Sequence, residues 1–214
     1  MQCVVEPHST GIGGDCFCFY APGGNAKSLV SYNGSGRTPA AASVDWYLSR
    51  DIKTIERQSP HSVTVPGAVD AWCNLNNDHG VLPLSDILQQ AIGYAEGGYP
   101  ISARVSYDHA KQIELLKRDA NAGSVFLNAG KTLQAGQMHW QPKLAQTLKK
   151  IAAHGRDAFY TGEVAQDIVS YLESLGGLHT LEDFAKASGE YVTPLSTNYR
   201  GCLLYTSPSP RDRG

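Results

Sequence analysis

The chain lacks the features that mark several large classes of protein. No run of about 18 apolar residues is present, so the sequence predicts no membrane span. Lys and Arg number 18 against 20 Asp and Glu, and the net charge of −2 favours no nucleic-acid partner. Internal repeats and a signal sequence after Met1 are also missing. The 214 residues, of which 42% are hydrophobic, are therefore enough for one domain with a sizeable core.

Patterns for binding a metal are absent as well. The five cysteines contain no Cys-x-x-Cys, and the seven histidines show no His-x-x-x-His spacing, so we expect neither a metal nor a cofactor. Cys3, Cys16, Cys18 and Cys73 lie in apolar stretches, and we predict that they are small buried hydrophobes. The compartment stays unassigned, although these cysteines and the missing signal favour the cytoplasm.

The most informative stretch is VVEPHSTGIGGD, residues 4–15, which has glycine at 11, 13 and 14. Such density is typical of a tight turn or of a close approach between backbones. A phosphate cradle is less favoured, because the spacing is G-x-G-G and no Gly-Lys-Ser/Thr follows.

Three side chains in this run could be functional. Glu6 and His8 suit general acid–base chemistry. For His8 we favour a structural hydrogen bond, and for Glu6 the capping of nearby backbone. Asp15 is predicted to accept hydrogen bonds from neighbouring N–H groups.

Helix and strand patterns alternate along the rest of the chain. Residues 15–20 and 26–32 are predicted strands around a turn at 22–25, and they form a hairpin. A further strand is expected at 191–199, with Pro194 indicating an edge or a bulge. Predicted helices span 66–77, 85–97, 101–118, 142–154 and 161–175, and capping-box spacing at 180–183 begins another. Ser85 and Thr161 are the predicted N-caps of their helices. The apolar residues expected to face inward are Leu88, Ala91, Ile92 and Ala95, then Leu144, Leu148, Ile151 and Ala152, then Val164, Ile168, Tyr171, Leu172 and Leu175.

The opening run resembles the signature near the start of the large subunit in the γ-glutamyltranspeptidase (glutathione hydrolase) family. Further stretches are similar to that family in the same order, so the resemblance covers about residues 1–201. They are SGRTPAAA (35–42), HSVTVPGAVDAW (61–72), LPLSDILQQAIGYAEGGYPIS (82–102), GRDAFYTGEVAQDIV (155–169), GGLHTLEDFA (176–185) and YVTPLSTNYRG (191–201).

The resemblance implies an α+β fold: a helix-rich, large-subunit portion of the αββα sandwich of N-terminal-nucleophile hydrolases. It implies a proenzyme that cleaves itself, a small-molecule amide substrate, and the protein's own small subunit as partner. Residues 1–201 would be part of the large subunit, truncated at both ends. The family's nucleophilic threonine begins the small subunit, so we expect no catalytic residue here and no activity from this piece alone.

Residues 202–214 differ in composition from what precedes them. They read CLLYTSPSPRDRG, rich in Ser, Pro and Arg, and they do not resemble the family's next segment. They look like a translated sequencing-library adapter, so we expect this tail to be non-native.

The clearest departure from the family concerns substrate binding. The glutamyl-specific branch has an arginine four residues before the proline of the Pro-Ala segment, where it holds the substrate α-carboxylate. Here that position is Ser35, four residues before Pro39, and Arg37 is a candidate for a displaced anion contact. The alternative for Arg37 is a surface arginine or a structural ion pair.

The form NGSGRTP looks more like the branch that includes oxamate amidohydrolase. Three functions therefore stay open: a γ-glutamyltransferase or hydrolase, an oxamate-type amidohydrolase on the same scaffold, and a non-catalytic binding domain or fragment.

Overall fold

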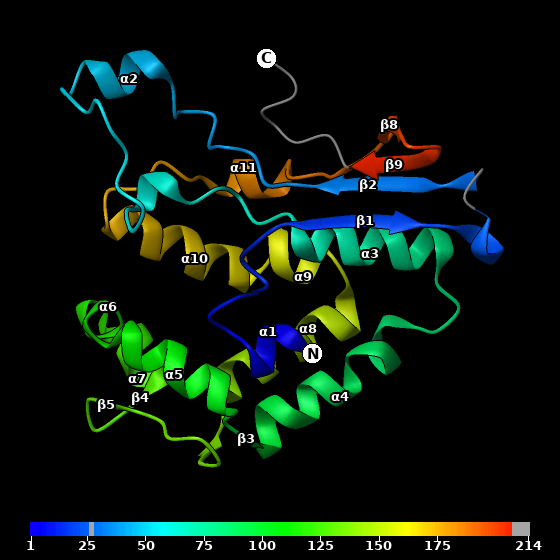
Figure 1. Cartoon of the computed structure of the whole chain (residues 1–214). Helices are drawn as coiled ribbons and strands as arrows, with labels where there is room; N and C mark the ends of the chain where they lie inside the picture. The colour runs from blue at the N-terminus through cyan, green and yellow to red at the C-terminus, as the bar shows by residue number, and fades with distance from the viewer. Residues whose placement is uncertain (26–27, 207–214) are drawn as a thin grey trace. The chain divides into compact units, whose positions relative to one another are not determined.

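The computed structural model describes residues 1–25 and 28–206, which form two compact units (Figure 1). Unit one comprises Met1–Gly11 and Leu82–Ala153, and unit two comprises, of the described residues, 12–25, 28–81 and 154–206.

Unit one is mainly helical. Its short strands pair as β3 with β6 and β4 with β5, both antiparallel. Its elements are α1 (Gln2–Val5), α4 (Leu84–Gly97), β3 (Tyr99–Pro100), α5 (Ala103–Lys111), α6 (Ile113–Arg118), α7 (Ala120–Phe126), β4 (Leu127–Asn128), β5 (Lys131–Thr132), β6 (Met138–His139) and α8 (Pro142–His154).

Two sequence predictions in unit one need correction. The helix expected over 101–118 is divided into α5 and α6, because Gln112 leaves helical geometry with φ −109° and ψ 13°. Helix α4 is capped by Pro83 and not by Ser85, whose hydroxyl donates to Asp86 Oδ1 within the first turn.

The core of unit one comes from apolar stripes on its longer helices. Buried side chains recur three or four residues apart, as an amphipathic helix requires. They are Leu88, Ala91 and Ala95 on α4 and Ala145, Leu148 and Ile151 on α8. Ile92, Leu144 and Ala152, which we also expected on these stripes, are only partly buried.

Unit two combines a three-stranded sheet, in the order β1-β2-β7, with helices. Its elements are β1 (Cys16–Tyr20), η1 (Pro22–Gly24), β2 (Val30–Gly34), α2 (Val44–Leu48), η3 (Pro60–Ser62), α3 (Ala68–His79), α9 (Asp157–Tyr160), α10 (Glu163–Ser174), α11 (Leu181–Ala185), β7 (Glu190–Val192), β8 (Leu195–Tyr199) and β9 (Cys202–Thr206).

The predicted hairpin is confirmed, since β1 and β2 pair antiparallel. Strand β2 begins at Val30, later than the predicted start at residue 26. Residues 26 and 27 of the predicted strand lie outside the described residues. Helix α3 lies along the β1–β2 pair (Figure 1), close to its predicted range of 66–77.

The register of the sheet assigns side chains to two faces, because residues directly opposite one another share a face. Tyr32 is opposite Cys18 and Tyr191, and it points to α3, where its hydroxyl donates to Asp70. The other face carries Asn33 with its partners Phe17 on β1 and Glu190 on β7.

Helix α10 differs from its prediction in its cap and in its buried stripe. Gly162 and not Thr161 is the N-cap, since the Thr161 hydroxyl donates to Asp157 O at the end of α9. The buried residues are Ala165, Val169 and Leu172. Of the predicted inward residues Val164, Ile168, Tyr171, Leu172 and Leu175, only Leu172 is buried, and Leu175 is 51% exposed. Choosing the most hydrophobic residues predicted the wrong buried face, because the small Ala165 is buried while the larger Val164 and Ile168 are only partly buried.

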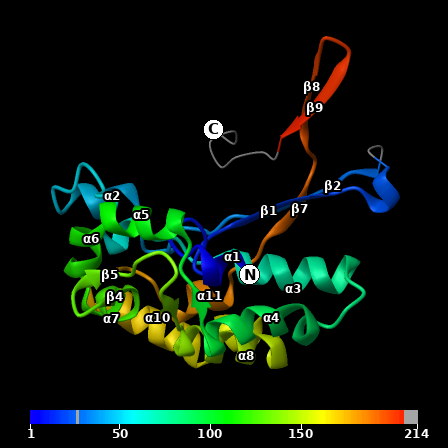
Figure 2. The ribbon, with the colours of Figure 1, turned by 60° about the horizontal axis from the view of Figure 1, so that its bottom comes forward.

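Pro194 divides the predicted strand 191–199 into β7 and β8. Strand β8 pairs antiparallel with β9, and every residue of both strands is exposed. In Figure 2 this hairpin projects away from the sheet of unit two.

The five cysteines are free. The prediction that four of them are buried is wrong, because Cys3, Cys16, Cys18 and Cys73 are only half-buried. Burial is still the main influence on Cys73, and it raises the pKa of that thiol to about 11.

Candidate functional site

The segment after β2 contains both predicted substrate-binding residues, Ser35 and Arg37. Backbone hydrogen bonds hold it: Gly36 N donates to Asp15 Oδ1 at 2.7 Å, and Val65 N donates to Arg37 O at 2.9 Å. The expected role of Asp15 as an acceptor for backbone N–H groups is confirmed.

Glycine is required where this segment meets the start of α3. A Cβ on Gly36 would lie 2.0 Å from Val65 O, and a Cβ on Gly67 would lie 2.1 Å from Gly34 O. By contrast, a Cβ on Gly13 would meet nothing within 4 Å. The close backbone approach therefore occurs at 34–36 and 67, not at Gly13 in the opening run.

The opening run receives the amino end of α3. Gly14 O accepts hydrogen bonds from Gly67 N at 3.0 Å and from Ala68 N at 2.9 Å, while Asp70 N donates to the Tyr160 hydroxyl at 3.1 Å. The run therefore has a structural role, because the Gly14 carbonyl caps the first N–H groups at the amino end of α3.

Arg37 and Ser35 lie in different environments. Arg37 Nη2 donates to Glu190 Oε1 at 3.0 Å, and the two side chains are 55% and 41% exposed. Ser35 is only 7% exposed, and its N–H donates to Asn33 Oδ1 at 3.1 Å. The structure thus brings Arg37 to an acid on β7, which is the ion pair that the sequence left open as its alternative.

His8 makes the structural contact that we favoured. Its Nε2 lies 3.1 Å from Asp108 Oδ2, which also accepts from Arg104 Nε at 2.5 Å. The hydrogen bond from Arg104 is the main cause of a lowered pKa for Asp108. Glu6 is the C-cap residue of α1, and its carbonyl accepts from Ser9 N at 3.0 Å.

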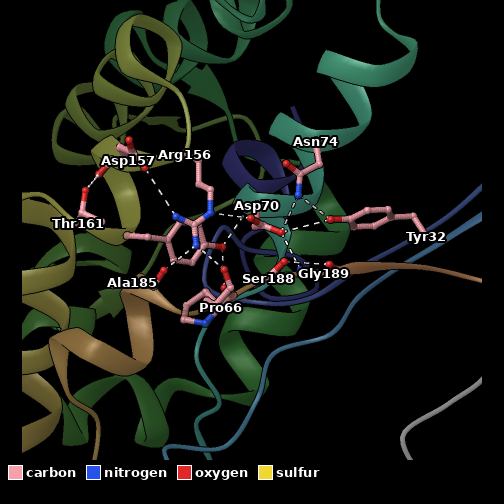
Figure 3. Close-up of polar contacts among 12 residues, drawn as sticks. Tyr32, Pro66, Asp70, Asn74, Arg156, Asp157, Thr161, Ala185, Ser188 and Gly189 are labelled. Carbon is pink, nitrogen blue, oxygen red and sulfur yellow. Dashed lines mark hydrogen bonds and ion pairs between the residues drawn. The ribbon is translucent and has the colours of Figure 1, made fainter.

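The most highly connected polar group in unit two is the Asp70 carboxylate on α3, which is 1% exposed (Figure 3). Its Oδ1 accepts from Arg156 Nε at 2.7 Å. Its Oδ2 accepts from Asn74 Nδ2 at 3.0 Å, from Gly189 N at 2.8 Å and from the Tyr32 hydroxyl at 3.2 Å. The carboxylate thereby connects α3, the sheet and the segment before β7.

Arg156 extends these connections. Its Nη2 donates to Ala185 O at 3.2 Å and also to Ala187 O. Tyr160, in the following helix, donates to Pro66 O at 2.6 Å. A buried acid is stable only when it is paired and hydrogen-bonded, and these residues meet that condition.

The Asp70 cluster is structural and not catalytic in its chemistry. The carboxylate is 1% exposed and both its oxygens accept protein hydrogen bonds, so a substrate cannot reach it. Burial raises the pKa of Tyr32 to about 12, so its hydroxyl keeps its proton and acts as a donor. Sequence reasoning missed this cluster, although an aspartate within the apolar run VTVPGAVDAW, residues 63–72, was a usable signal.

Across residues 1–25 and 28–206, no group of three or more His, Cys, Asp or Glu side chains could hold a metal ion. In the same residues, no helix is both long and apolar enough to cross a bilayer.

Comparison with known proteins identifies the scaffold. A family model described as gamma-glutamyltranspeptidase matches residues 1–214. The glutathione hydrolase-like YwrD proenzyme of Bacillus subtilis is 38% identical over 99% of this chain and 40% of its own length. The oxamate amidohydrolase proenzyme of Klebsiella pneumoniae is 30% identical over 97% of this chain and 40% of its own.

The three-dimensional structure agrees. The crystal structure of Helicobacter pylori gamma-glutamyltranspeptidase superposes with a TM-score of 0.89 at 27% identity, covering 98% of this chain and 60% of that one. The expected fold class, α+β and part of the N-terminal-nucleophile hydrolase fold, is confirmed. The chain spans about 40% of the length of the two proenzymes that it matches. By sequence and by structure, it belongs to the γ-glutamyltranspeptidase family.

Proposed function

We propose that the complete protein is an amide hydrolase or acyltransferase that works through an acyl-enzyme on the amino-terminal threonine of a small subunit. Self-cleavage of a proenzyme would release that threonine, and its own amine would act as base. The present chain would supply large-subunit residues. The family match over residues 1–214 is the observation that carries this proposal, and the names of the two relatives as proenzymes support it.

The sheet of unit two supports a partnership with the small subunit. The face opposite α3 carries Phe17 and Phe19, which are 48% and 44% exposed. Two exposed phenylalanines on one sheet face are suited to packing against a second sheet. Glu190, which holds Arg37, lies on this same face.

For the substrate, Ser35 favours the second candidate, an oxamate-type amidohydrolase. A serine that is 7% exposed cannot provide the bidentate guanidinium that a glutamyl α-carboxylate would need. A smaller acid amide requires only one cationic contact, and we propose that Arg37 supplies it. Sequence identity does not separate the two branches, since the glutathione hydrolase-like proenzyme is 38% identical and the oxamate amidohydrolase proenzyme is 30% identical. The choice therefore rests on Ser35.

The first test is made on the complete protein. It should cleave itself into two subunits, visible by mass spectrometry, and the purified product should be assayed on oxamate and on a γ-glutamyl anilide. Turnover of oxamate is expected. Release of the anilide without oxamate turnover would reverse the choice of branch, and absence of both cleavage and turnover would favour a non-catalytic protein.

The second test concerns Arg37. Replacing Arg37→Ala should raise KM for oxamate by roughly tenfold or more, since a charged hydrogen bond contributes about 1.5–3 kcal/mol. Arg50→Ala is the matched control, because Arg50 is a surface arginine over the Trp46 ring at 4.1 Å. An Arg37→Ala variant whose KM equals that of Arg50→Ala would remove Arg37 from the substrate site.

We also propose that residues 202–214 are non-native. Their composition supports this, while the family model that matches residues 1–214 extends over them and argues against it. Sequencing the source gene again should yield a different continuation after Gly201. The same tail in independent clones would contradict the proposal.

A further inference from the structure

The ion pair between Arg37 and Glu190 joins residues 153 positions apart. Arg37 Nη2 donates to Glu190 Oε1 at 3.0 Å, and a guanidinium has five N–H groups. This hydrogen bond uses one of the five. Both side chains are partly exposed, so water and solutes reach the pair.

The backbone that carries Glu190 is held firmly on both sides. Gly189 N donates to the buried Asp70 carboxylate at 2.8 Å, and a Cβ at position 189 would lie 2.6 Å from Tyr32 Cε1. Glu190 itself begins β7 and is paired with Asn33 of β2. The sheet and the hydrogen bond to Asp70 therefore fix the backbone that positions the Glu190 carboxylate next to Arg37.

We infer that Glu190 is a positioning residue that sets the charge preference of the proposed acyl site by competing for Arg37. This inference rests on the proposed contact between Arg37 and substrate. Glu190 presents to Arg37 the same chemical group that an acidic substrate would present. An anionic acyl group must displace or share that carboxylate, whereas a neutral amide has no need to do so.

The size of the effect follows from the exposure of the pair. Exposed ion pairs contribute about 0.2–1 kcal/mol, which corresponds to roughly a 1.4-fold to fivefold change in affinity. Removing the charge of Glu190 should strengthen the binding of anionic substrates by this factor and leave neutral ones unchanged.

The experiment uses the complete protein and two amides of nearly equal size, oxamate with one negative charge and oxamide with none. In Glu190→Gln, KM for oxamate should fall about 1.4-fold to fivefold, with kcat and the KM for oxamide unchanged. Glu190→Asp, which retains the charge, should fall between wild type and Glu190→Gln. Glu182→Gln is the control, because it removes an exposed acid that pairs with Lys186.

The outcomes separate this inference from the proposed function. If Arg37→Ala raises KM for oxamate while Glu190→Gln leaves it unchanged, the competition is disproved and the Arg37 contact stands. If neither variant changes that KM, both are disproved. An equal KM change for oxamate and oxamide would show a structural effect and also overturn the inference.

Binding gives a readout that does not require turnover. Oxalate carries the same acyl group as an anion and has no amide bond to hydrolyse. Calorimetric titration of wild type, Glu190→Gln and Arg37→Ala with oxalate should rank their affinities in the order Glu190→Gln, wild type, Arg37→Ala. Any other order, including no oxalate binding by all three proteins, would contradict the competition.

Discussion

At the scale of single residues, glycine decides how closely the backbones of unit two approach. Gly67 precedes α3, and the carbonyl of Gly34 occupies the space that a side chain at 67 would need. This contact lets Gly67 N and Ala68 N reach Gly14 O. Three segments of the chain therefore meet at a point where no methyl group fits.

Replacing Gly67→Ala should destabilise the protein by about 1–3 kcal/mol, because the new Cβ would lie 2.1 Å from Gly34 O. Gly93→Ala is a matched control inside α4, where a Cβ meets nothing within 4 Å, and it should stabilise by about 0.5–1 kcal/mol. Urea unfolding measures both. Equal effects from the two variants would contradict the proposed close contact.

At the scale of elements, the Asp70 carboxylate binds α3 to the sheet and to the segment before β7. Its partners come from residues 32, 74, 156 and 189, and no two of these belong to one element. Helix α11 is anchored in a similar way. Asp183 completes the capping box with Thr180 and also accepts from Ala40 N at 2.9 Å.

Asp70→Asn should destabilise the protein by about 3 kcal/mol, because Arg156 would lose its charged partner and an amide would face several donors. The Arg156 side chain is 25% exposed, so the expected loss of stability is at the lower end of the range for a buried pair. Asp167→Asn, at an exposed position on α10, should change the free energy of unfolding little. A cost for Asp70→Asn as small as that of Asp167→Asn would show that the pair contributes little.

At the scale of the whole molecule, buried histidines occur in both units. Burial is the main cause of a lowered pKa for His109, His139 and His179, whose ordinary value is 6.5. His8 lowers that of His109 further, and His109 does the same to His139. These three side chains are therefore neutral in the folded protein near neutral pH.

Because the unfolded chain binds these protons more readily, stability should fall as the pH drops below about 6.5 and level off below the folded pKa values. Urea unfolding between about pH 7.5 and 5.5 measures this loss. His139→Phe should flatten the curve in this window. Asp183 titrates in a separate range. Burial raises its pKa, but hydrogen bonds from Ala40 and Thr180 outweigh burial and hold the pKa below 3.8, so its contribution to stability is lost only at more acidic pH. A pH-independent free energy of unfolding from 7.5 to 5.5 would contradict the burial of neutral histidines.

Local pattern was enough to predict much of this fold. The strand at 16–20, its hairpin partner and the helix after Pro66 follow from periodicity and turn residues, which act over a few positions. The Thr180–Asp183 capping box spans three residues and needed no tertiary information. The family motifs, also local, were sufficient to identify the scaffold.

The buried face of a helix and the partners of long-range ion pairs could be known only from the folded chain. The buried stripe of α10 passes through Ala165, Val169 and Leu172, and the elements packed against the helix decide which of its faces is buried. Arg156 finds Asp70 across 86 positions, and Arg37 finds Glu190 across 153. No periodicity encodes such pairs, because the path of the chain between the partners decides which charges meet.

The sequence by itself determined that this chain belongs to the γ-glutamyltranspeptidase family and carries serine at position 35, since both are properties of residue order. Only the tertiary structure decided that Arg37 faces an acid held in place by a buried aspartate. The physical reason is that ion pairs and close backbone contacts depend on distances in space, which many intervening residues set together.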